Sequence, residues 1–211
     1  WTEGREAEED ETGPDGQLPM HTAAAAGSLK CLELLLQHET PVNTPTAKTL
    51  ETPLHLASAN NQLSAVRMLL HAGANPDLPD DLGRTPHDRA LEAGADAIVQ
   101  LLQHHSTLQA ARHGEATIIG DGVGAVDEKT GLTALGVAVM NGNVGMVEAL
   151  LEAKASPTEG SLTAVQCAVA KHSSHDNLGL VKLLLHHQAD PNYAAPATQP
   201  PVVMAARHQE T

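Results

Sequence analysis

One six-residue pattern recurs along the chain, and its spacing limits the folds that the chain can adopt. The copies are LPMHTA at 18–23, TPLHLA at 52–57, TPHDRA at 85–90, TALGVA at 133–138 and TAVQCA at 163–168. Their starts are separated by 34, 33, 48 and 30 residues. A second apolar segment follows most copies, as in LSAVRMLLHAGANPD from Leu63. Because one such unit cannot bury its apolar face alone, the units are predicted to stack on one another.

The second copy shows why each unit should form a pair of helices. Thr52 can cap the free amide groups at a helix start, and Pro53 at the first helical position gives up no needed donor. Ala57 allows close approach of neighbouring helices, Leu69 lies on the apolar face of the second helix, and Gly73 suits a left-handed residue that ends it. The positions assigned to this structural motif are His21, Thr52, Pro53, His55, Gly73, Thr85, Thr133 and Thr163.

These motifs resemble the ankyrin repeat, and TPLHLA followed by LLHAGANPD is the most specific match. The resemblance covers residues 17–211 and implies an all-α solenoid whose helix pairs are joined by short β-turn or hairpin fingers. It also implies that His21 and His55 brace neighbouring loops through hydrogen bonds. We expect about six repeats and a truncated terminal one, near residues 16–48, 49–81, 82–106, 107–128, 129–159, 160–196 and 197–211.

The repeat at 107–128 is compressed. TLQAARHGEATII at 107–119 predicts a first helix with a turn glycine at Gly114, and GDGVG at 120–124 replaces or shortens the second helix. Three other units have Glu39, Lys154 or Gln188 in place of the helix-ending glycine, at a cost of up to about 1 kcal/mol each in a left-handed conformation. The junction of the third and fourth repeats is therefore predicted to be the softest place and a candidate hinge.

The composition favours a stack of thin helical units. The chain has 33 Ala and 28 Leu but no Phe, and its aromatic residues are Trp1 and Tyr193. A β-sandwich or barrel normally uses aromatic and β-branched residues. No apolar run approaches the roughly 18 residues of a membrane-spanning helix, so no membrane insertion is expected. Two cysteines form no disulfide framework, which favours an intracellular protein, with the cytoplasm preferred over the nucleus.

The charge of the chain is strongly negative and unevenly distributed. The formal net charge is -14, and residues 1–15 hold seven acidic side chains and one basic one. We interpret residues 1–15 as an acidic, disordered tail and residues 16–211 as the repeat domain. Binding to nucleic acid is not expected, because neutralising phosphates needs clustered cations.

The thirteen histidines have structural explanations that outweigh a metal site. Most of those outside the motif fall in the last turns of second helices, where a partly cationic imidazole suits the helix dipole. The least explained pair, His172 and His175, has Asp176 beside it but no further ligand at suitable spacing.

The remaining candidates for catalytic chemistry are equally weak. GDGVG lacks the strand, the helix and the Lys-Ser/Thr pair of a phosphate-binding loop. Cys31 and Cys167 lie on predicted helices that face neighbours and are expected to be buried, inert thiols. We therefore predict no enzyme activity, no catalytic residue, no metal site and no cofactor.

A partner protein is expected on the concave face of the stack, which the fingers and the exposed sides of the first helices form. This face holds six of the twelve Lys and Arg residues but only five of the 26 acids, so it should bind an acidic and apolar protein segment. The candidate partner-binding residues are Lys48, Arg84, Glu92, Arg112, His113, Lys129, Leu132, Met140, Asn141, Leu162, Lys171, Arg207 and His208.

Three functions are compatible with a stack of such repeats. The first is a monomeric scaffold that binds a partner protein through the concave face. The second is a regulatory or substrate-docking module of a larger multidomain enzyme or signalling protein. The third is an architectural spacer. The fold alone does not decide among them.

Overall fold

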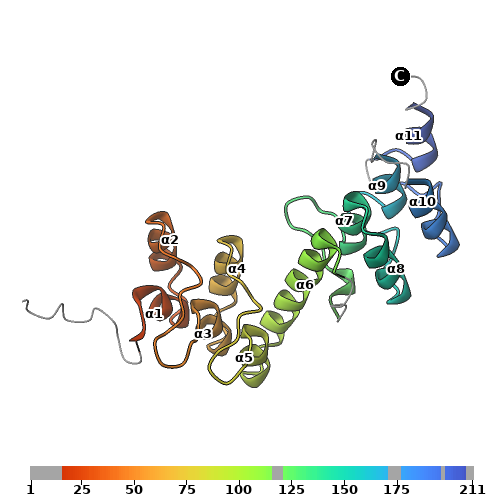
Figure 1. Cartoon of the computed structure of the whole chain (residues 1–211). Helices are drawn as coiled ribbons and strands as arrows, with labels where there is room; N and C mark the ends of the chain where they lie inside the picture. Colours follow the sequence, from red (N-terminus) through yellow and green to blue (C-terminus); the bar gives the residue numbers. More distant parts are fainter. Residues whose placement is uncertain (1–15, 116–120, 171–176, 196–197, 208–211) are drawn as a thin grey trace, which may run out of the picture. The chain divides into compact units, whose positions relative to one another are not determined.

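A computed structural model describes residues 16–115, 121–170, 177–195 and 198–207. Within these residues the regular structure is helical, which confirms the all-α prediction (Figure 1). An isolated antiparallel bridge joins Val126 to Thr133. The α-helices are α1 (Pro19–Ala25), α2 (Leu29–Gln37), α3 (Pro53–Ala59), α4 (Leu63–His71), α5 (Pro86–Glu92), α6 (Asp96–His113), α7 (Ala134–Asn141), α8 (Val144–Glu152), α9 (Ala164–Ala170), α10 (Asn177–His186) and α11 (Pro201–Arg207), and a short 3-10 helix, η2, spans Asp121–Gly124.

The chain divides into two compact units, with the boundary between Leu102 and Gln103. In unit 1, α1 packs on α3 and α3 on α5, while α2 packs on α1 and α4. Figure 1 shows α1, α3 and α5 in one row of this unit and α2 and α4 in a second row. Aliphatic side chains, Ala and Met form the core of this unit, and its fully buried side chains include Met20, Leu32, Leu54, Leu69 and Ile98.

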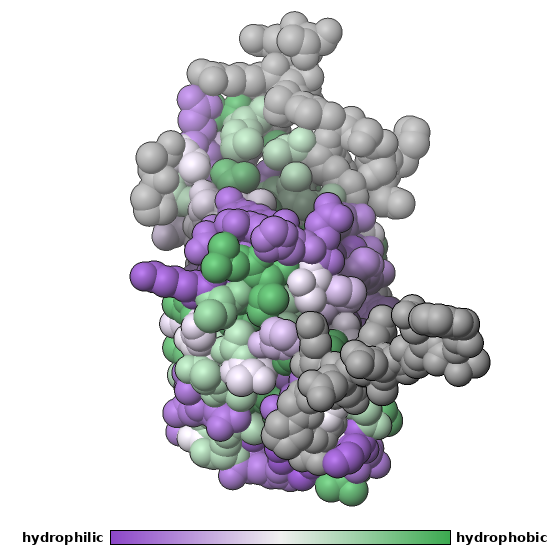
Figure 2. Space-filling view, turned by 90° about the vertical axis from the view of Figure 1, so that its left-hand side faces the viewer, coloured by the Kyte–Doolittle hydropathy of each residue, from purple (hydrophilic) through white to green (hydrophobic). Residues whose placement is uncertain are grey.

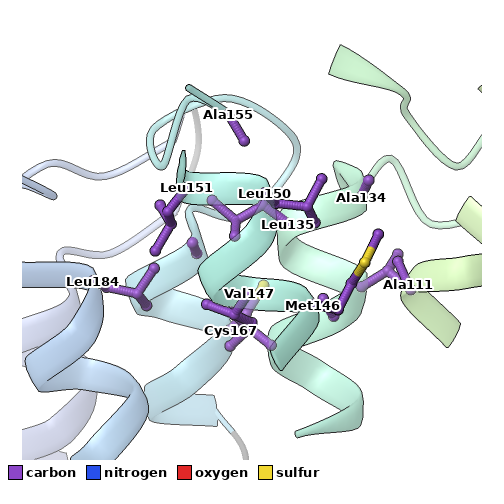
Figure 3. Close-up of a cluster of buried hydrophobic side chains, with 14 of the residues drawn as sticks. Ala111, Ala134, Leu135, Met146, Val147, Leu150, Leu151, Ala155, Cys167 and Leu184 are labelled. Carbon is purple, nitrogen blue, oxygen red and sulfur yellow. The ribbon is translucent and has the colours of Figure 1, made fainter. Parts of the chain in front are cut away.

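Unit 2 repeats this packing with other helices. The first helices α7, α9 and α11 contact one another in order, and α8 and α10 pack on α7 and α9. Figure 3 shows the core between them, where Leu135, Met146, Val147 and Leu150 lie together and Leu184 approaches from α10. The described cores of both units are built from aliphatic side chains, Ala, Met and one Cys, as the composition predicts.

The compressed repeat does not form a helix pair of its own. Residues 107–113 continue α6, which runs unbroken from Asp96 to His113. The described helices therefore give five pairs in chain order, followed by α11, so the count is about five repeats rather than six. No Gly or Pro lies between 96 and 113, so nothing in the local sequence stops the helix before Gly114, which has a φ of 83°.

The second half of α6 still makes the contacts of a first helix within unit 2. Its Ala110 carbonyl accepts a hydrogen bond from the Glu115 amide, five residues on, as Ala138 does from Asn143. The Asn143 side chain donates to the Ala111 carbonyl at 2.8 Å and covers Gly114. The sequence pattern thus predicted a helix with its turn glycine at Gly114, as the structure shows, but missed the fusion of this helix with the preceding one.

The three residues that replace a helix-ending glycine do adopt the left-handed conformation. The φ angles of Glu39, Lys154 and Gln188 are 56°, 66° and 64°, and Gly73 has a φ of 86°. A side chain with a Cβ atom is strained in this region, whereas glycine is not.

Lys154→Gly is therefore expected to raise the free energy of unfolding by about 0.5–1 kcal/mol, because the relieved strain exceeds the added entropy of the unfolded chain. Lys154 is exposed, so the change removes little packing. Urea denaturation followed by circular dichroism measures the change. Glu148→Gly, at an exposed position inside α8, serves as the control and should lower stability by about 1 kcal/mol. A loss of stability in Lys154→Gly would contradict this assignment of strain.

Candidate functional site

The segments between each second helix and the next first helix form the fingers. Backbone hydrogen bonds close three of them into tight turns: Thr46 to Glu51 at 2.9 Å, Asp80 to Arg84 at 2.8 Å and Asp127 to Leu132 at 2.8 Å, each named from donor to acceptor. We name them finger 1 (residues 39–52), finger 2 (residues 74–85) and finger 3 (residues 125–133). Each unit has its own finger face, which consists of the fingertips of that unit and the outward sides of its first helices.

The motif histidines hold fingers 1 and 2 in place. In both rings Nδ1 lies 3.1 Å from a backbone amide at the start of the helix, that of Leu18 for His21 and that of Thr52 for His55. The other ring nitrogen, Nε2, lies 2.9 Å from the Thr44 carbonyl oxygen in His21 and 3.0 Å from that of Arg84 in His55. Burial lowers the pKa of both imidazoles, so both rings are neutral at pH 7.

Other residues stand at the histidine position in later repeats. Asp88 accepts hydrogen bonds from the Thr85 amide and hydroxyl, both at 2.8 Å, which hold the pKa of the Asp88 carboxyl below its ordinary value. Gly136 has no side chain, and its amide donates to the Thr133 hydroxyl at 3.2 Å.

The last described copy has Gln166 at this position, and it reproduces the histidine geometry. Its Oε1 accepts from the Thr163 amide at 2.8 Å. Its Nε2 donates to the Gln199 carbonyl at 2.6 Å and to the Thr198 hydroxyl at 2.8 Å. An amide therefore links neighbouring repeats in unit 2 through the bonds that an imidazole makes in unit 1.

An ion-pair network crosses the finger face of unit 1. The Arg84 guanidinium binds the buried Asp80 carboxylate at 2.8 Å and lies 3.3 Å from Glu92. Arg89 lies 2.7 Å from Glu51 and 3.2 Å from Glu92. The two arginines are thus shared among three carboxylates, and this part of the face is near neutral or slightly negative.

A related pair stabilises finger 3 in unit 2. The Arg112 side chain donates to the Asp127 carboxylate, which also accepts from the Lys129 amide at 2.9 Å. Burial raises the pKa of Asp127, but the hydrogen bonds from Lys129 and Arg112 outweigh it and hold the pKa below its ordinary value. The structure therefore pairs the predicted cation Arg112 with a buried acid, which also binds the backbone amide of Lys129.

Exposed leucines stand out on the finger face of unit 1. Leu50 and Leu82, at the tips of adjacent fingers, are 46% and 69% exposed, and Leu91 on α5 is 54% exposed. The Asp81 amide donates to the Thr49 carbonyl at 3.0 Å, which joins the two fingertips beside these leucines.

Leu50 is also strained. Its φ is 52°, whereas the equivalent residues of fingers 2 and 3, two places before the helix-starting threonine, are Gly83 and Gly131. A leucine costs about 1–2 kcal/mol in this conformation, and such strain clusters at functional positions.

The predicted partner-binding residues fall into four groups. Lys48, Glu92, Arg112, His113, Lys129, Met140 and Asn141 are exposed, and Arg84, Leu132 and Leu162 are half-buried. Lys171 and His208 lie outside the described residues, and Arg207 is described only as part of α11. Lys48, Arg84 and Glu92 belong to unit 1, whereas the others belong to unit 2.

Sequence reasoning missed several residues that organise these surfaces. Asp80 and Asp127 each lie at the base of a finger, accept backbone amides and bind an arginine. Arg89 of α5 ties finger 1 to the helix through Glu51. A signal did exist for the two aspartates, since an acid precedes the helix-starting threonine by five or six residues in both repeats.

The two cysteines differ in their surroundings. Cys167 is buried, and burial raises the pKa of its thiol to about 12, so it is not a nucleophile at pH 7. Cys31 is exposed, contrary to the prediction. Its counterparts Ala65 and Met146 are buried because a preceding repeat packs on them, whereas no described helix precedes α1.

Figure 2 looks onto the end of unit 1 that carries α1 and α2, where apolar groups gather among hydrophilic ones. Leu29 and Leu34 of α2 are among the exposed large apolar side chains of the chain.

The described residues show neither a metal site nor a membrane span. They hold no group of three or more His, Cys, Asp or Glu side chains placed to bind a metal ion. His172 and His175 lie outside them. The described helices also include none whose length and hydropathy would let it cross a bilayer.

Known proteins share these repeats. The family model for ankyrin repeats (3 copies) matches residues 3–80, 51–112 and 107–195. Human neurogenic locus notch homolog protein 4 is 39% identical over 106 residues, which are 44% of this chain and 5% of that protein. NF-kappa-B inhibitor alpha from Sus scrofa is 37% identical over 108 residues, covering 48% of this chain and 29% of the relative. B-cell lymphoma 3 protein homolog from Mus musculus is 29% identical over 184 residues, covering 84% of this chain and 38% of that protein.

Among solved structures, the human ASB11 ankyrin repeat domain aligns with a TM-score of 0.41 and 24% identity, over 90% of this chain and 98% of that one. The chain spans well under half the length of each of the three relatives above. The family model, by contrast, matches most of the chain. This protein belongs to the ankyrin repeat family.

Proposed function

We propose that this chain is a protein-binding module whose partner contacts the finger face. Ankyrin repeat domains are in general protein-protein interaction modules. The observation that carries the proposal for this chain is the pair of exposed leucines, Leu50 and Leu82, on adjacent fingertips. Exposed apolar side chains that gather on one surface mark an interaction site, and their burial in a complex favours binding.

The charges of the finger face shape the kind of partner that it would accept. Arg84 and Arg112 are bound by carboxylates of the chain itself, so they offer less attraction to an acidic partner than their number suggests. We assign the affinity to the apolar side chains at the fingertips of unit 1, Leu50 and Leu82, which suits an apolar protein segment.

A second candidate function is a docking module inside a larger protein. The chain spans 5% of the notch homolog and 38% of the B-cell lymphoma 3 homolog, so the matching repeats of these relatives are parts of longer chains. In this alternative the fingertip leucines would bind another domain of the same protein. We expect the chain to act inside the cell, whether it binds a separate protein or another domain of its own protein.

Site-directed photocrosslinking would identify the partner. A photoreactive amino acid replaces Leu82 in the full-length protein in its own cells, and the same amino acid at Ser64, exposed on α4, is the matched control. We expect an adduct from position 82 that position 64 does not give, either with a separate protein or within the same chain. Identical adducts from both positions would contradict a role for the finger face.

Leu50→Gly then tests the surface with the crosslinked partner. We expect a gain of about 1 kcal/mol in the free energy of unfolding, from relieved strain, together with a loss of about tenfold in affinity, from the missing side chain. Urea denaturation and titration calorimetry measure the two effects. Leu34→Ala, which truncates an exposed leucine of α2, should leave the affinity unchanged. If Leu50→Gly and Leu82→Glu both bind as tightly as the unchanged protein, the proposed function is wrong.

A further inference from the structure

His21 is a buried titratable group at the junction of helix α1 and finger 1. Its Nε2 lies 2.9 Å from the Thr44 carbonyl oxygen, and a carbonyl oxygen can only accept a hydrogen bond. Its Nδ1 lies 3.1 Å from the Leu18 amide, which can only donate. The proton of the neutral ring is therefore on Nε2, and Nδ1 has to stay unprotonated for both hydrogen bonds to exist.

His55 makes the same two bonds but has an alternative when it is protonated. The Thr52 hydroxyl oxygen lies 2.9 Å from His55 Nδ1, and a hydroxyl can reverse its role and accept from an N–H group. At the equivalent position next to His21 stands Leu18, whose side chain has no acceptor. A second proton on His21 would thus point at the Leu18 amide, donor against donor, at a fully buried site.

The charged groups around the two rings differ as well. His21 faces the Glu51 carboxylate of finger 1, which favours a second proton. His55 faces Glu51, Asp80 and the Arg89 guanidinium, and this last group opposes a second proton. For both rings burial is the largest influence, and it lowers the pKa below that of a free histidine.

Unit 2 contains the corresponding link without a titratable group. Gln166 bonds the Thr163 amide at 2.8 Å and the Gln199 carbonyl at 2.6 Å, and a carboxamide does not titrate between pH 5 and 8. Gly136, at the same position of the preceding repeat, has no side chain to protonate. The two units should therefore respond differently to acid.

We propose that His21 is a pH-sensitive latch: in mild acid a second proton on Nδ1 opposes the Leu18 amide, the ring leaves its site, and finger 1 loses its bond from Nε2 to the Thr44 carbonyl, while the Gln166 link in unit 2 stays closed. The direction follows from linkage. A histidine whose folded-state pKa is lowered adds stability above about pH 6.5, and this stability is lost as the pH falls below that value.

Amide hydrogen exchange at pH 7.5 and 5.5, corrected for the intrinsic exchange rates, tests the latch. The probes are the Thr46 and Glu51 amides, which bond within finger 1. We expect their protection to fall by up to about tenfold at pH 5.5, since each opening then takes up one proton. The Thr163 amide of unit 2, which bonds Gln166, should keep its protection within about twofold.

Two variants separate the latch from general acid sensitivity. His21→Gln copies the Gln166 link, so finger 1 should keep its bonds and lose its pH dependence. Leu18→Thr supplies the hydroxyl that His55 has, so the fall in protection should become smaller. The proposal is overturned if finger 1 of the unchanged protein is equally protected at both pH values, or if His21→Gln shows the same fall. If His21→Gln does not fold, Leu18→Thr tests the proposal instead. A loss of amide protection in Leu18→Thr as large as in the unchanged protein overturns the latch.

Discussion

Asp80→Ala is expected to lower the free energy of unfolding by about 2–4 kcal/mol, the largest loss that we predict for unit 1. The Asp80 carboxylate is buried and accepts from the Leu82 amide at 2.9 Å and the Arg84 amide at 2.8 Å. It also accepts from the Arg84 side chain at 2.9 Å. Alanine would leave two donors of a tight turn and a half-buried guanidinium without their acceptor.

The neighbouring aspartate provides the matched control. Asp81 is exposed, and its backbone amide donates to the Thr49 carbonyl at 3.0 Å. Asp81→Ala keeps that amide, so its stability should stay within about 0.5 kcal/mol of the unchanged protein. Urea denaturation at pH 7 compares the two variants. Equal losses in both would show that the charge of finger 2, rather than its hydrogen bonds, stabilises the turn.

The pH dependence of this difference has a definite sign. Burial raises the pKa of Asp80, but the hydrogen bonds from the Arg84 side chain and from the Arg84 and Leu82 amides outweigh it and hold the pKa below its ordinary value. A carboxylate of this kind adds stability above its unfolded pKa and loses it as the pH falls through its folded pKa. The difference in the free energy of unfolding between Asp80→Ala and the unchanged protein should therefore be largest at pH 7 and become smaller below about pH 4.

Local signals in the sequence account for much of the fold. Thr85 and Pro86 mark the start of α5, and Thr133 marks that of α7, because capping and proline geometry depend on a few neighbouring residues. The repeat register alone predicted that Lys154 and Gln188 would take the left-handed conformation at the ends of their helices. These features need no knowledge of distant parts of the chain.

Features that depend on distant residues could not be predicted in the same way. The Arg89–Glu51 pair joins residues 38 apart in sequence, and the burial of a residue such as Cys31 depends on which repeat packs against it. The fused helix α6 was missed for the opposite reason, because the prediction relied on the repeat pattern and not on the local sequence. The repeat register favoured a break near residue 106, but the local sequence has no residue that stops a helix, and the local preference determines the structure.

The finger face was only partly predictable for a related reason. The cations Arg84 and Arg112 were expected to meet a partner, and their carboxylate neighbours became visible only in the folded chain. Leu50, by contrast, was missed because a lone leucine in a turn carries no periodic signal, and its strain is a property of the backbone. Charge counts along a sequence therefore describe composition better than they describe the exposed surface.

Gly122→Ala is expected to destabilise unit 2 by about 2–3 kcal/mol, because η2 packs directly on the second half of α6. A Cβ atom at Gly122 would clash with the Thr107 hydroxyl oxygen and lie 2.8 Å from the Gln103 carbonyl oxygen. Thr107 is buried and bonds that same carbonyl at 2.9 Å, so neither group can move away without losing the hydrogen bond. The GDGVG segment thus requires this glycine for packing.

Gly124→Ala is the control for this prediction, since a Cβ atom there meets nothing within 4 Å and the change should be close to neutral. Urea denaturation of both variants gives the two free energies, and hydrogen exchange of the Ala125 and Glu115 amides shows whether the loss is local to η2 and the end of α6. If Gly122→Ala proves as stable as Gly124→Ala, the contact between η2 and α6 does not hold the compressed repeat together. A large loss in Gly122→Ala alone would show that the contact between η2 and α6 leaves no room for a side chain at this position.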